Sequence, residues 1–160
     1  MPARVRTASS RVAQALAALD RASMRKTPQR VAIVRAFVDD VTHPTAQQIF
    51  DRLRRAMPTM SFATVYNTLA ALEQAGVCRT LELDGAAGEG GRRFDPIVEP
   101  HDHAVCDRCG AVRDVPRHAQ QSAGAPLEGF HVRAIDRIYR GECARCRSSS
   151  AEQSANSAEK

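Results

Sequence analysis

The stretch Arg92–Val115 reads RRFDPIVEPHDHAVCDRCGAVRDV and concentrates side chains that bind metals. It contains two imidazoles, two thiols and two carboxylates as candidate ligands: Asp95, His101, His103, Cys106, Cys109 and Asp114. The residues before it are basic and carry helical hydrophobic patterns. The residues after it have a short strand pattern and end in a second cysteine pair. The stretch is therefore predicted to be a metal-binding joint between two unlike halves.

The size of the chain suits one ordinary domain or two small ones, since it has 160 residues. Two small domains would need additional staples, and metal ions are a common kind. No apolar run approaches membrane-spanning length. The N-terminus is basic but lacks the apolar segment of a secretory signal, so a cytoplasmic location without a membrane partner is expected.

Charge is unevenly distributed along the chain. Residues 1–80 contain 12 Lys and Arg against 5 Asp and Glu, a net charge of +7, whereas residues 81–160 contain 11 against 13, a net charge of −2. A basic half beside an acidic half favours a polyanionic partner for the first. A solvated, Arg-rich surface without a partner is the alternative.

Hydrophobic spacing predicts two helices early in the first half, after a disordered basic leader at 1–9. The first covers about 10–22 and is marked by Val12, Leu16 and Leu19. The second opens at Thr27-Pro28, since Thr caps free N–H groups and Pro suits the first helical position. It is predicted to end near 39–40, and its apolar stripe contains Val31, Ile33, Val34, Phe37 and Val38.

Two further helices are predicted at 45–56 and 61–75. Thr45 and Gln48 have the spacing of a capping box for the third helix. Pro44 holds His43 out of helical geometry, which leaves that histidine on a restrained corner; a surface residue is the ordinary interpretation there. Ser61 caps the fourth helix, and Gly76 suits its C-terminal end.

The fourth helix has one buried and one polar face. The buried stripe is predicted to contain Phe62, Val65, Leu69 and Leu72. The outer face is polar and nearly free of acid, which suits a helix in the major groove of DNA. An ordinary amphipathic helix remains the alternative. The candidate DNA-contacting residues are Ser61, Ala63, Thr64, Tyr66 and Asn67.

A hairpin follows the fourth helix. Residues 77–83 alternate as a strand, residues 84–91 form a Gly-rich turn, and residues 92–94 form a second strand. Three helices followed by such a hairpin are the plan of a winged helix-turn-helix. The turn lacks the Lys-Ser/Thr ending of a phosphate-binding loop. Cys78 is predicted to pack as a small buried hydrophobe.

Two C-x-x-C pairs are present, Cys106 with Cys109 and Cys143 with Cys146. Four thiolates form the tetrahedral shell that structural Zn²⁺ prefers, and a closed shell indicates stability, not catalysis. A redox dithiol or an iron–sulfur cluster is the alternative.

The harder candidate ligands are imidazoles and carboxylates. His101 and His103 share a face if they lie on a strand. With Asp95 and Asp114 they make a set that suits Fe²⁺, Mn²⁺ or Zn²⁺, and the absence of a thiolate favours the first two. Surface placement of the two histidines is the alternative. The sequence does not show whether these residues converge.

The chain resembles the ferric uptake regulator (Fur) family of bacterial metal-dependent repressors. The matching motifs occur in family order from about residue 24 to 147: TPQR at 27–30, HPTAQQIF at 43–50, TVYNTL at 64–69, RFD at 93–95, HDHAVCDRCG at 101–110 and the final CARC.

The resemblance implies an α+β homodimer that binds a palindromic operator in double-stranded DNA. A leader and first helix at 1–23 would precede a winged-helix domain at 24–95, an α/β dimerisation domain at 96–147 and a disordered tail at 148–160. A Zn²⁺ would bind the four cysteines of the two pairs. A regulatory Fe²⁺ or Mn²⁺ at the hinge would bind His43, Asp95, His101, His103 and Asp114.

Asp95 and Asp114 stand where iron-uptake regulators usually have Glu, and this resembles the peroxide-sensing PerR branch. There, bound Fe²⁺ reacts with hydrogen peroxide and a ligating histidine is oxidised; His43 and His101 match the oxidised positions. Mn²⁺ in the same site would repress and resist peroxide. An iron- or other metal-responsive repressor without peroxide sensing is the alternative. Zinc-uptake regulators usually place a Cys in the sensing site, which does not fit this chain.

The chain departs from the family pattern at 116–129 (PRHAQQSAGAPLEG), where a longer, more apolar dimerisation helix is usual. A strand is still predicted over 130–140, and residues 147–160 have a disordered composition. A non-haem metalloenzyme is a competing class, but five protein ligands leave little room for substrate, and no enzyme activity is expected. A zinc-stapled interaction module without DNA binding is opposed by the basic first half.

Overall fold

The computed structural model describes residues 7–83, 91–117, 128–129, 131 and 135–149. The chain divides into two compact units. The helical unit spans Met1–Leu83 and Gly91–Val98, and the remaining residues form the sheet unit. None of the helices in the described part combines the length and apolarity needed to span a membrane.

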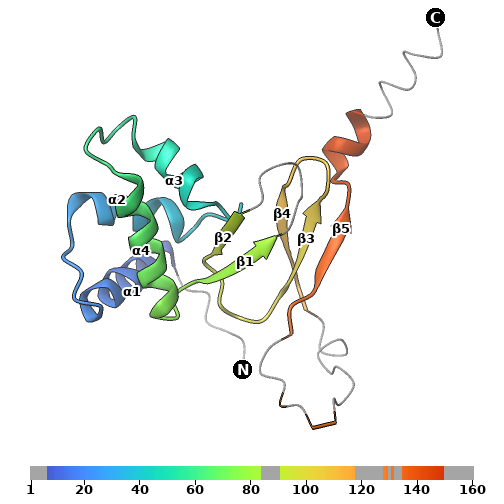
Figure 1. Cartoon of the computed structure of the whole chain (residues 1–160), viewed down its shortest axis with the longest axis horizontal. Helices are drawn as coiled ribbons and strands as arrows, with labels where there is room; N and C mark the ends of the chain where they lie inside the picture. Colours follow the sequence, from blue (N-terminus) through green and yellow to red (C-terminus); the bar gives the residue numbers. More distant parts are fainter. Residues whose placement is uncertain (1–6, 84–90, 118–127, 130, 132–134, 150–160) are drawn as a thin grey trace, which may run out of the picture. The chain divides into compact units, whose positions relative to one another are not determined.

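Four helices and a hairpin make up the helical unit (Figure 1). They are α1 (Ala8–Arg21), α2 (Pro28–Phe37), α3 (Ala46–Leu53), α4 (Phe62–Gln74), β1 (Arg79–Leu83) and β2 (Gly91–Asp95). The helices begin where a side-chain oxygen accepts a backbone N–H, and the caps predicted at Thr27, Thr45 and Ser61 are confirmed. Thr7 caps α1 in the same way, so this helix begins inside the stretch that was predicted to be a disordered leader.

The core of the helical unit combines one face of each helix with the hairpin. Val65, Leu69 and Leu72 of α4 are fully buried there, as predicted. Phe94 of β2 packs edge-to-face on Phe37 of α2, with ring centroids 6.4 Å apart, and so attaches the hairpin to the helices. Cys78 lies in the same core, which confirms its predicted packing.

The prediction that Phe62 is buried is wrong, because this side chain is 44% exposed. Phe62 is the first residue of α4, one turn before the helix reaches the core at Val65. Its ring packs instead between Phe50 of α3 and Tyr66 of α4, at centroid distances of 6.2 and 6.3 Å.

The hairpin is an antiparallel pair in which Arg79 lies opposite Asp95 and Leu83 lies opposite Gly91. Residues 84–90 of the turn predicted at 84–91 lie outside the described residues, and Gly91 begins β2. Gly76, just after α4, has a φ of +67°, the left-handed conformation that favours glycine at the end of a helix. The hairpin is also attached to the corner before α3, since Phe94 N donates to Pro44 O at 3.0 Å.

The described part of the sheet unit contains a three-stranded sheet in the order β4-β3-β5 (Figure 1). Its strands are β3 (Asp102–Cys106), β4 (Val112–Val115) and β5 (Ile138–Gly141). β3 pairs antiparallel with β4 and parallel with β5. Of the strand predicted over 130–140, residues 130 and 132–134 lie outside the described residues, and the described strand begins at Ile138. The carbonyl of Ile135 accepts a hydrogen bond from Arg117 Nη2 at 2.7 Å.

A helix at 144–149 follows β5, so the first residues of the predicted disordered tail are helical. The hydroxyls of Ser148 and Ser149 donate to the carbonyls of Ala144 and Arg145, one turn earlier in this helix. The rest of the predicted tail, from residue 150, lies outside the described residues, as does most of the departing segment, at 118–127.

Candidate metal centres and nucleic-acid interface

The structure brings the four cysteines of the two C-x-x-C pairs together in the sheet unit. Cys106 ends β3, Cys109 follows in the turn before β4, and the second pair lies where β5 gives way to the last helix. This cysteine cluster, Cys106, Cys109, Cys143 and Cys146, has its sulfur atoms within 4.8 Å of one another.

The spacing of the sulfurs fits a tetrahedral metal. The Sγ atoms of Cys109 and Cys143 are 3.8 Å apart. Four Zn–S bonds of about 2.3 Å in a tetrahedron place neighbouring sulfurs roughly 3.8 Å apart. All four cysteines are free thiols. The cluster therefore has both the chemistry and the dimensions of a structural Zn²⁺ site.

Backbone hydrogen bonds prepare part of the cluster for a cation. The N–H of Cys143 donates to Cys106 Sγ at 3.3 Å. This bond, with one from the Cys109 N–H, lowers the pKa of Cys106 to about 6. The hydrogen bond with Cys109, together with burial, raises the pKa of Cys146 to about 12. Because adjacent thiols resist joint ionisation, complete deprotonation calls for a bound cation.

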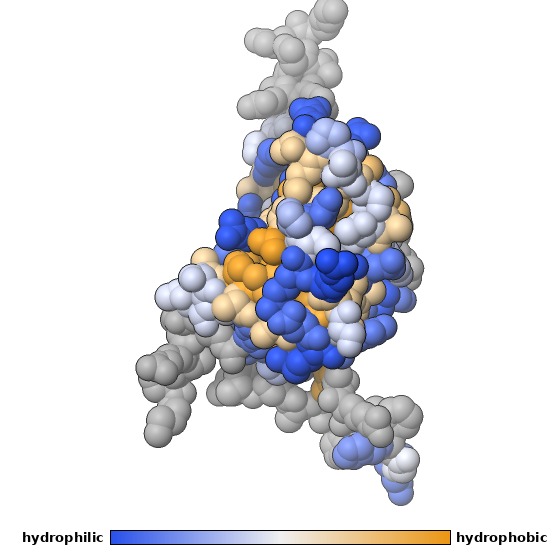
Figure 2. All heavy atoms as spheres, turned by 90° about the vertical axis from the view of Figure 1, so that its left-hand side faces the viewer, coloured by the Kyte–Doolittle hydropathy of each residue, from blue (hydrophilic) through white to orange (hydrophobic). Residues whose placement is uncertain are grey.

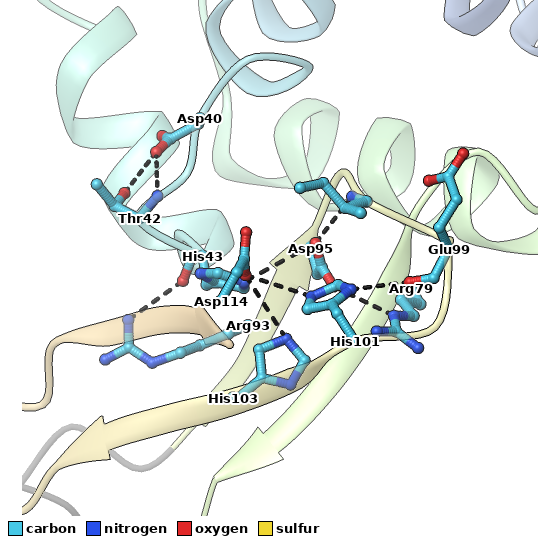
Figure 3. A network of polar contacts seen from close by, with 11 residues as sticks. Asp40, Thr42, His43, Arg79, Arg93, Asp95, Glu99, His101, His103 and Asp114 are labelled. Atoms are coloured by element: carbon cyan, nitrogen blue, oxygen red, sulfur yellow. Dashed lines mark hydrogen bonds and ion pairs between the residues drawn. The ribbon is translucent and has the colours of Figure 1, made fainter. Parts of the chain in front are cut away.

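His43 and Asp95 form the second group of candidate ligands, within the helical unit (Figure 3). His43 Nε2 lies 3.8 Å from Asp95 Oδ1, and both side chains are essentially unexposed. The ordinary interpretation of such a histidine as a surface residue therefore does not hold for His43. Its backbone has a φ of +53°, which is uncommon for a residue other than glycine.

Two contacts hold the unusual corner at His43 in place. Arg93 Nη1 donates to the His43 carbonyl at 3.2 Å. On the preceding side, Thr42 N donates to Asp40 Oδ1 at 2.9 Å, and Arg52 pairs with the other oxygen. Burial alone would raise the pKa of Asp40, but the bonds from Thr42 and Arg52 outweigh it and hold that pKa below its usual value.

The third group, His101, His103 and Asp114, lies within the sheet unit (Figure 3). Asp114 of β4 lies directly opposite His103 of β3. Its Oδ1 is 3.3 Å from His101 Nε2 and 3.9 Å from His103 Nε2. The two imidazole rings are 4.5 Å apart. The sheet register therefore brings these three candidates together.

A backbone contact sets the orientation of one imidazole. His101 Nδ1 lies 2.8 Å from Glu99 O, a carbonyl that can only accept a hydrogen bond. A proton on Nδ1 would donate to this carbonyl, and Nε2 faces Asp114 Oδ1 at 3.3 Å. An imidazole held in this way is prepared to bind a metal through Nε2.

Two histidines remain, His118 and His131. His131 is exposed, and His118 lies outside the described residues. The groups contain only nitrogen and oxygen donors, which suit Fe²⁺ or Mn²⁺ better than a thiol-rich site would. Sequence reasoning missed the arginines that hold the carboxylates: Arg79 on Asp95, and Arg117 on the buried Asp102 between the two histidines. The Arg79–Asp95 pair could have been found only from the register of the hairpin, which places these two residues opposite each other.

The outer face of α4 carries the candidate DNA-contacting residues. Ser61, Ala63, Tyr66 and Asn67 are exposed, and Thr64 is half-buried with its hydroxyl 2.8 Å from that of Ser61. Phe62 adds an aromatic ring to the same surface. Figure 2 shows a face of the molecule on which hydrophilic residues surround a smaller hydrophobic group.

Comparison with known protein families gives one clear match. The model of the ferric uptake regulator family matches residues 21–136. The peroxide operon regulator of Bacillus subtilis is 37% identical over 142 residues, which is 87% of this chain and 95% of that protein.

Solved structures show the same fold. The ferric uptake regulator of Helicobacter pylori superimposes with a TM-score of 0.72 at 22% identity, over 91% of this chain and 97% of that one. The iron-bound ferric uptake regulator of Francisella tularensis gives a TM-score of 0.63 at 26% identity, over 78% of this chain and 95% of that one. The winged-helix and α/β architecture expected from the sequence is thereby confirmed.

Proposed function

The chain belongs to the ferric uptake regulator family, and we propose that it is a metal-dependent repressor that releases DNA on exposure to hydrogen peroxide. Repression that depends on a metal follows from the family. The peroxide response is supported by 37% identity to a peroxide operon regulator over 87% of this chain. Asp at positions 95 and 114 is a further resemblance to the peroxide-sensing branch.

We assign a structural Zn²⁺ to the cysteine cluster. The cluster supplies four thiols at tetrahedral spacing and leaves no position open. Its ligands belong to a small sheet with few buried hydrophobic residues among those described, so the metal would supply much of the stability of this unit.

The regulatory metal, Fe²⁺ or Mn²⁺, would take His43 and Asp95 from the helical unit and His101, His103 and Asp114 from the sheet unit. The observation that carries this assignment is the composition of the two groups: three imidazoles and two carboxylates, with no thiol among them. Neither group alone fills the shell of such a cation. Occupancy of all five positions would make the posture of the DNA-binding unit depend on metal.

When bound, iron would supply the redox chemistry that splits the O–O bond of peroxide. In the net reaction one oxygen atom would be added to a ring carbon of His43 or His101, which loses two electrons, and the other oxygen atom would leave as water. His43 is buried on a strained corner and His101 is oriented by Glu99 O, so each presents a fixed ring to the site. An oxidised imidazole is a poorer ligand, so metal and DNA would both be released.

The DNA partner is supported by charge and by surface. Residues 1–80 carry a net charge of +7, and the exposed face of α4 presents Tyr66 and Asn67 for base contacts. A palindromic operator would match a homodimer. β5 is an edge strand of the sheet formed by the described residues, and its four residues are all exposed, a surface that a second copy would cover.

Gel-shift binding to an operator selected from random duplexes tests the proposal. Zinc-loaded protein would be charged anaerobically with Fe²⁺ or Mn²⁺ and given a low dose of peroxide. Peptides containing His43 and His101 would then be analysed by mass spectrometry. Release in the iron form alone, with one oxygen added to either histidine, is the expected result. Continued binding with unmodified histidines would leave a metal-responsive repressor without peroxide sensing.

A further inference from the structure

Arg79 holds one oxygen of Asp95. The two residues are directly opposite each other in the β1–β2 hairpin. Arg79 Nε donates to Asp95 Oδ2 at 3.1 Å. The Asp95 side chain is fully buried, whereas that of Arg79 is 28% exposed, so Arg79 is the more solvent-exposed member of the pair. Both side chains are drawn in Figure 3.

The other oxygen of Asp95 has different surroundings. Oδ1 accepts the backbone N–H of Ile97 at 2.8 Å and lies 3.8 Å from His43 Nε2. The carboxylate of Asp95 therefore has Oδ1 on the side of the candidate ligand His43 and Oδ2 on the side of the Arg79 guanidinium.

We propose that Arg79 is a positioning residue that makes Asp95 a one-oxygen ligand of the regulatory metal. The inference rests on the proposed role of Asp95 in metal binding. Carboxylates bind cations through one oxygen or through both. A guanidinium is permanently charged and donates in a rigid plane, so it restrains Oδ2 more firmly than a flexible ammonium would.

The consequence is a lower coordination number. With Oδ2 held by Arg79, the metal receives one oxygen from Asp95 instead of two. One fewer protein donor leaves space at the metal for a small molecule of the size of peroxide. Arg79 would thus favour a reactive site over a saturated one, although its side chain never touches the metal.

The test uses Co²⁺ as a spectroscopic probe in protein whose cysteine cluster is already filled with Zn²⁺. Visible d–d absorption of Co²⁺ weakens steeply as the coordination number rises from five to six. Arg79→Gln would be compared with wild type and with Arg92→Gln. The Arg92 change removes the same charge from the same hairpin, but its partner is Glu73 and not Asp95. The affinity for Co²⁺ is not the quantity to measure. Arg79→Gln removes a contact that positions Asp95 and also a positive charge that repels the metal, and these two losses change the affinity in opposite directions.

In Arg79→Gln the molar absorptivity of bound Co²⁺ is expected to fall by at least about twofold, as the second oxygen of Asp95 joins the metal. Arg92→Gln should keep the wild-type spectrum. Arg79→Lys separates the charge from the geometry of the side chain. A wild-type Co²⁺ spectrum in this variant would show that a positive charge is sufficient, whereas the spectrum of Arg79→Gln would show that the planar guanidinium is required.

Two results would overturn the inference, and they are distinguishable. An unchanged Co²⁺ spectrum in Arg79→Gln, at full occupancy and with native circular dichroism, overturns the role of Arg79 alone. Failure of the zinc-loaded wild type to bind a further Co²⁺ overturns the proposed regulatory site and the role of Arg79 with it.

Discussion

The cysteine cluster and the histidine–carboxylate groups are both candidate metal sites, but their ligands are distributed differently between the two units. All four sulfurs of the cysteine cluster belong to the sheet unit, and each pair is only three residues apart in sequence. The five nitrogen and oxygen donors are divided, with two in the helical unit and three in the sheet unit. With the ligands proposed above, the first arrangement would close a shell inside one unit, whereas the second would leave each unit with an incomplete one.

Under the proposed assignment, the chain would hold one metal for stability and use another as a signal. A closed tetrahedral shell within one unit stabilises that unit whatever the other unit does. If each unit supplies only part of the shell, the cation binds tightly only to conformations in which both parts meet. Binding would therefore shift the conformational equilibrium of the two units toward those conformations.

The largest expected effect comes from Cys106→Ser, which removes one ligand of the closed shell. Binding of a structural Zn²⁺ contributes about 10–16 kcal/mol in small zinc domains, so its loss should unfold the sheet unit. Zinc content by atomic absorption and the far-ultraviolet circular dichroism of the strands would measure this. The helical unit should keep its helices, since its core contains no member of the cluster.

Cys78→Ala is the matched control. Cys78 is buried in the helical unit, and burial raises its pKa to about 12, so it stays a neutral thiol. This variant should retain a full complement of zinc. Zinc retention by Cys106→Ser with an intact sheet would contradict the assignment of the closed shell.

A smaller effect is expected from His103→Ala, which removes one donor from an incomplete shell. His103 is buried beside Asp114, but the cysteine cluster does not depend on it. Zinc content should be unchanged, while Mn²⁺ affinity should fall by more than the roughly 10–100-fold that is typical for losing a hydrogen-bonding partner of a ligand. Isothermal titration of zinc-loaded protein with Mn²⁺ measures this directly.

His131→Ala controls for the loss of an imidazole from the same unit, since His131 is exposed. Its Mn²⁺ affinity should match that of wild type. Equal affinities in His103→Ala and wild type would remove His103 from the regulatory site.

Much of the local structure could be predicted because it depends on residues close in sequence. The caps at Thr27, Thr45 and Ser61 are formed with N–H groups three residues later. The three-residue spacing within each cysteine pair is typical of a metal site and can be recognised in the sequence.

What could not be predicted depends on contacts between distant segments. The burial of His43 comes from its packing near β2, some 50 residues later, and from the Arg93 bond to its carbonyl. The exposure of Phe62 comes from the point at which α4 meets the core, which helical periodicity does not specify. Arg79 became identifiable only once the hairpin register was known.

The smallest effect separates the stability of the helical unit from the geometry of its metal ligands. Thr45 and Thr7 each cap a helix with a side-chain oxygen, in bonds of 3.2 and 3.4 Å. Either change to Ala should lower the unfolding free energy of the helical unit by about 1 kcal/mol, measured by urea denaturation. Thr45, however, lies two residues after His43, and its backbone also bridges to Arg93. Thr45→Ala should therefore weaken Mn²⁺ binding as well, while Thr7→Ala should leave it unchanged. Equal Mn²⁺ affinities in the two variants would mean that the corner at His43 is held by Arg93 and Asp40 alone, without help from the capping box.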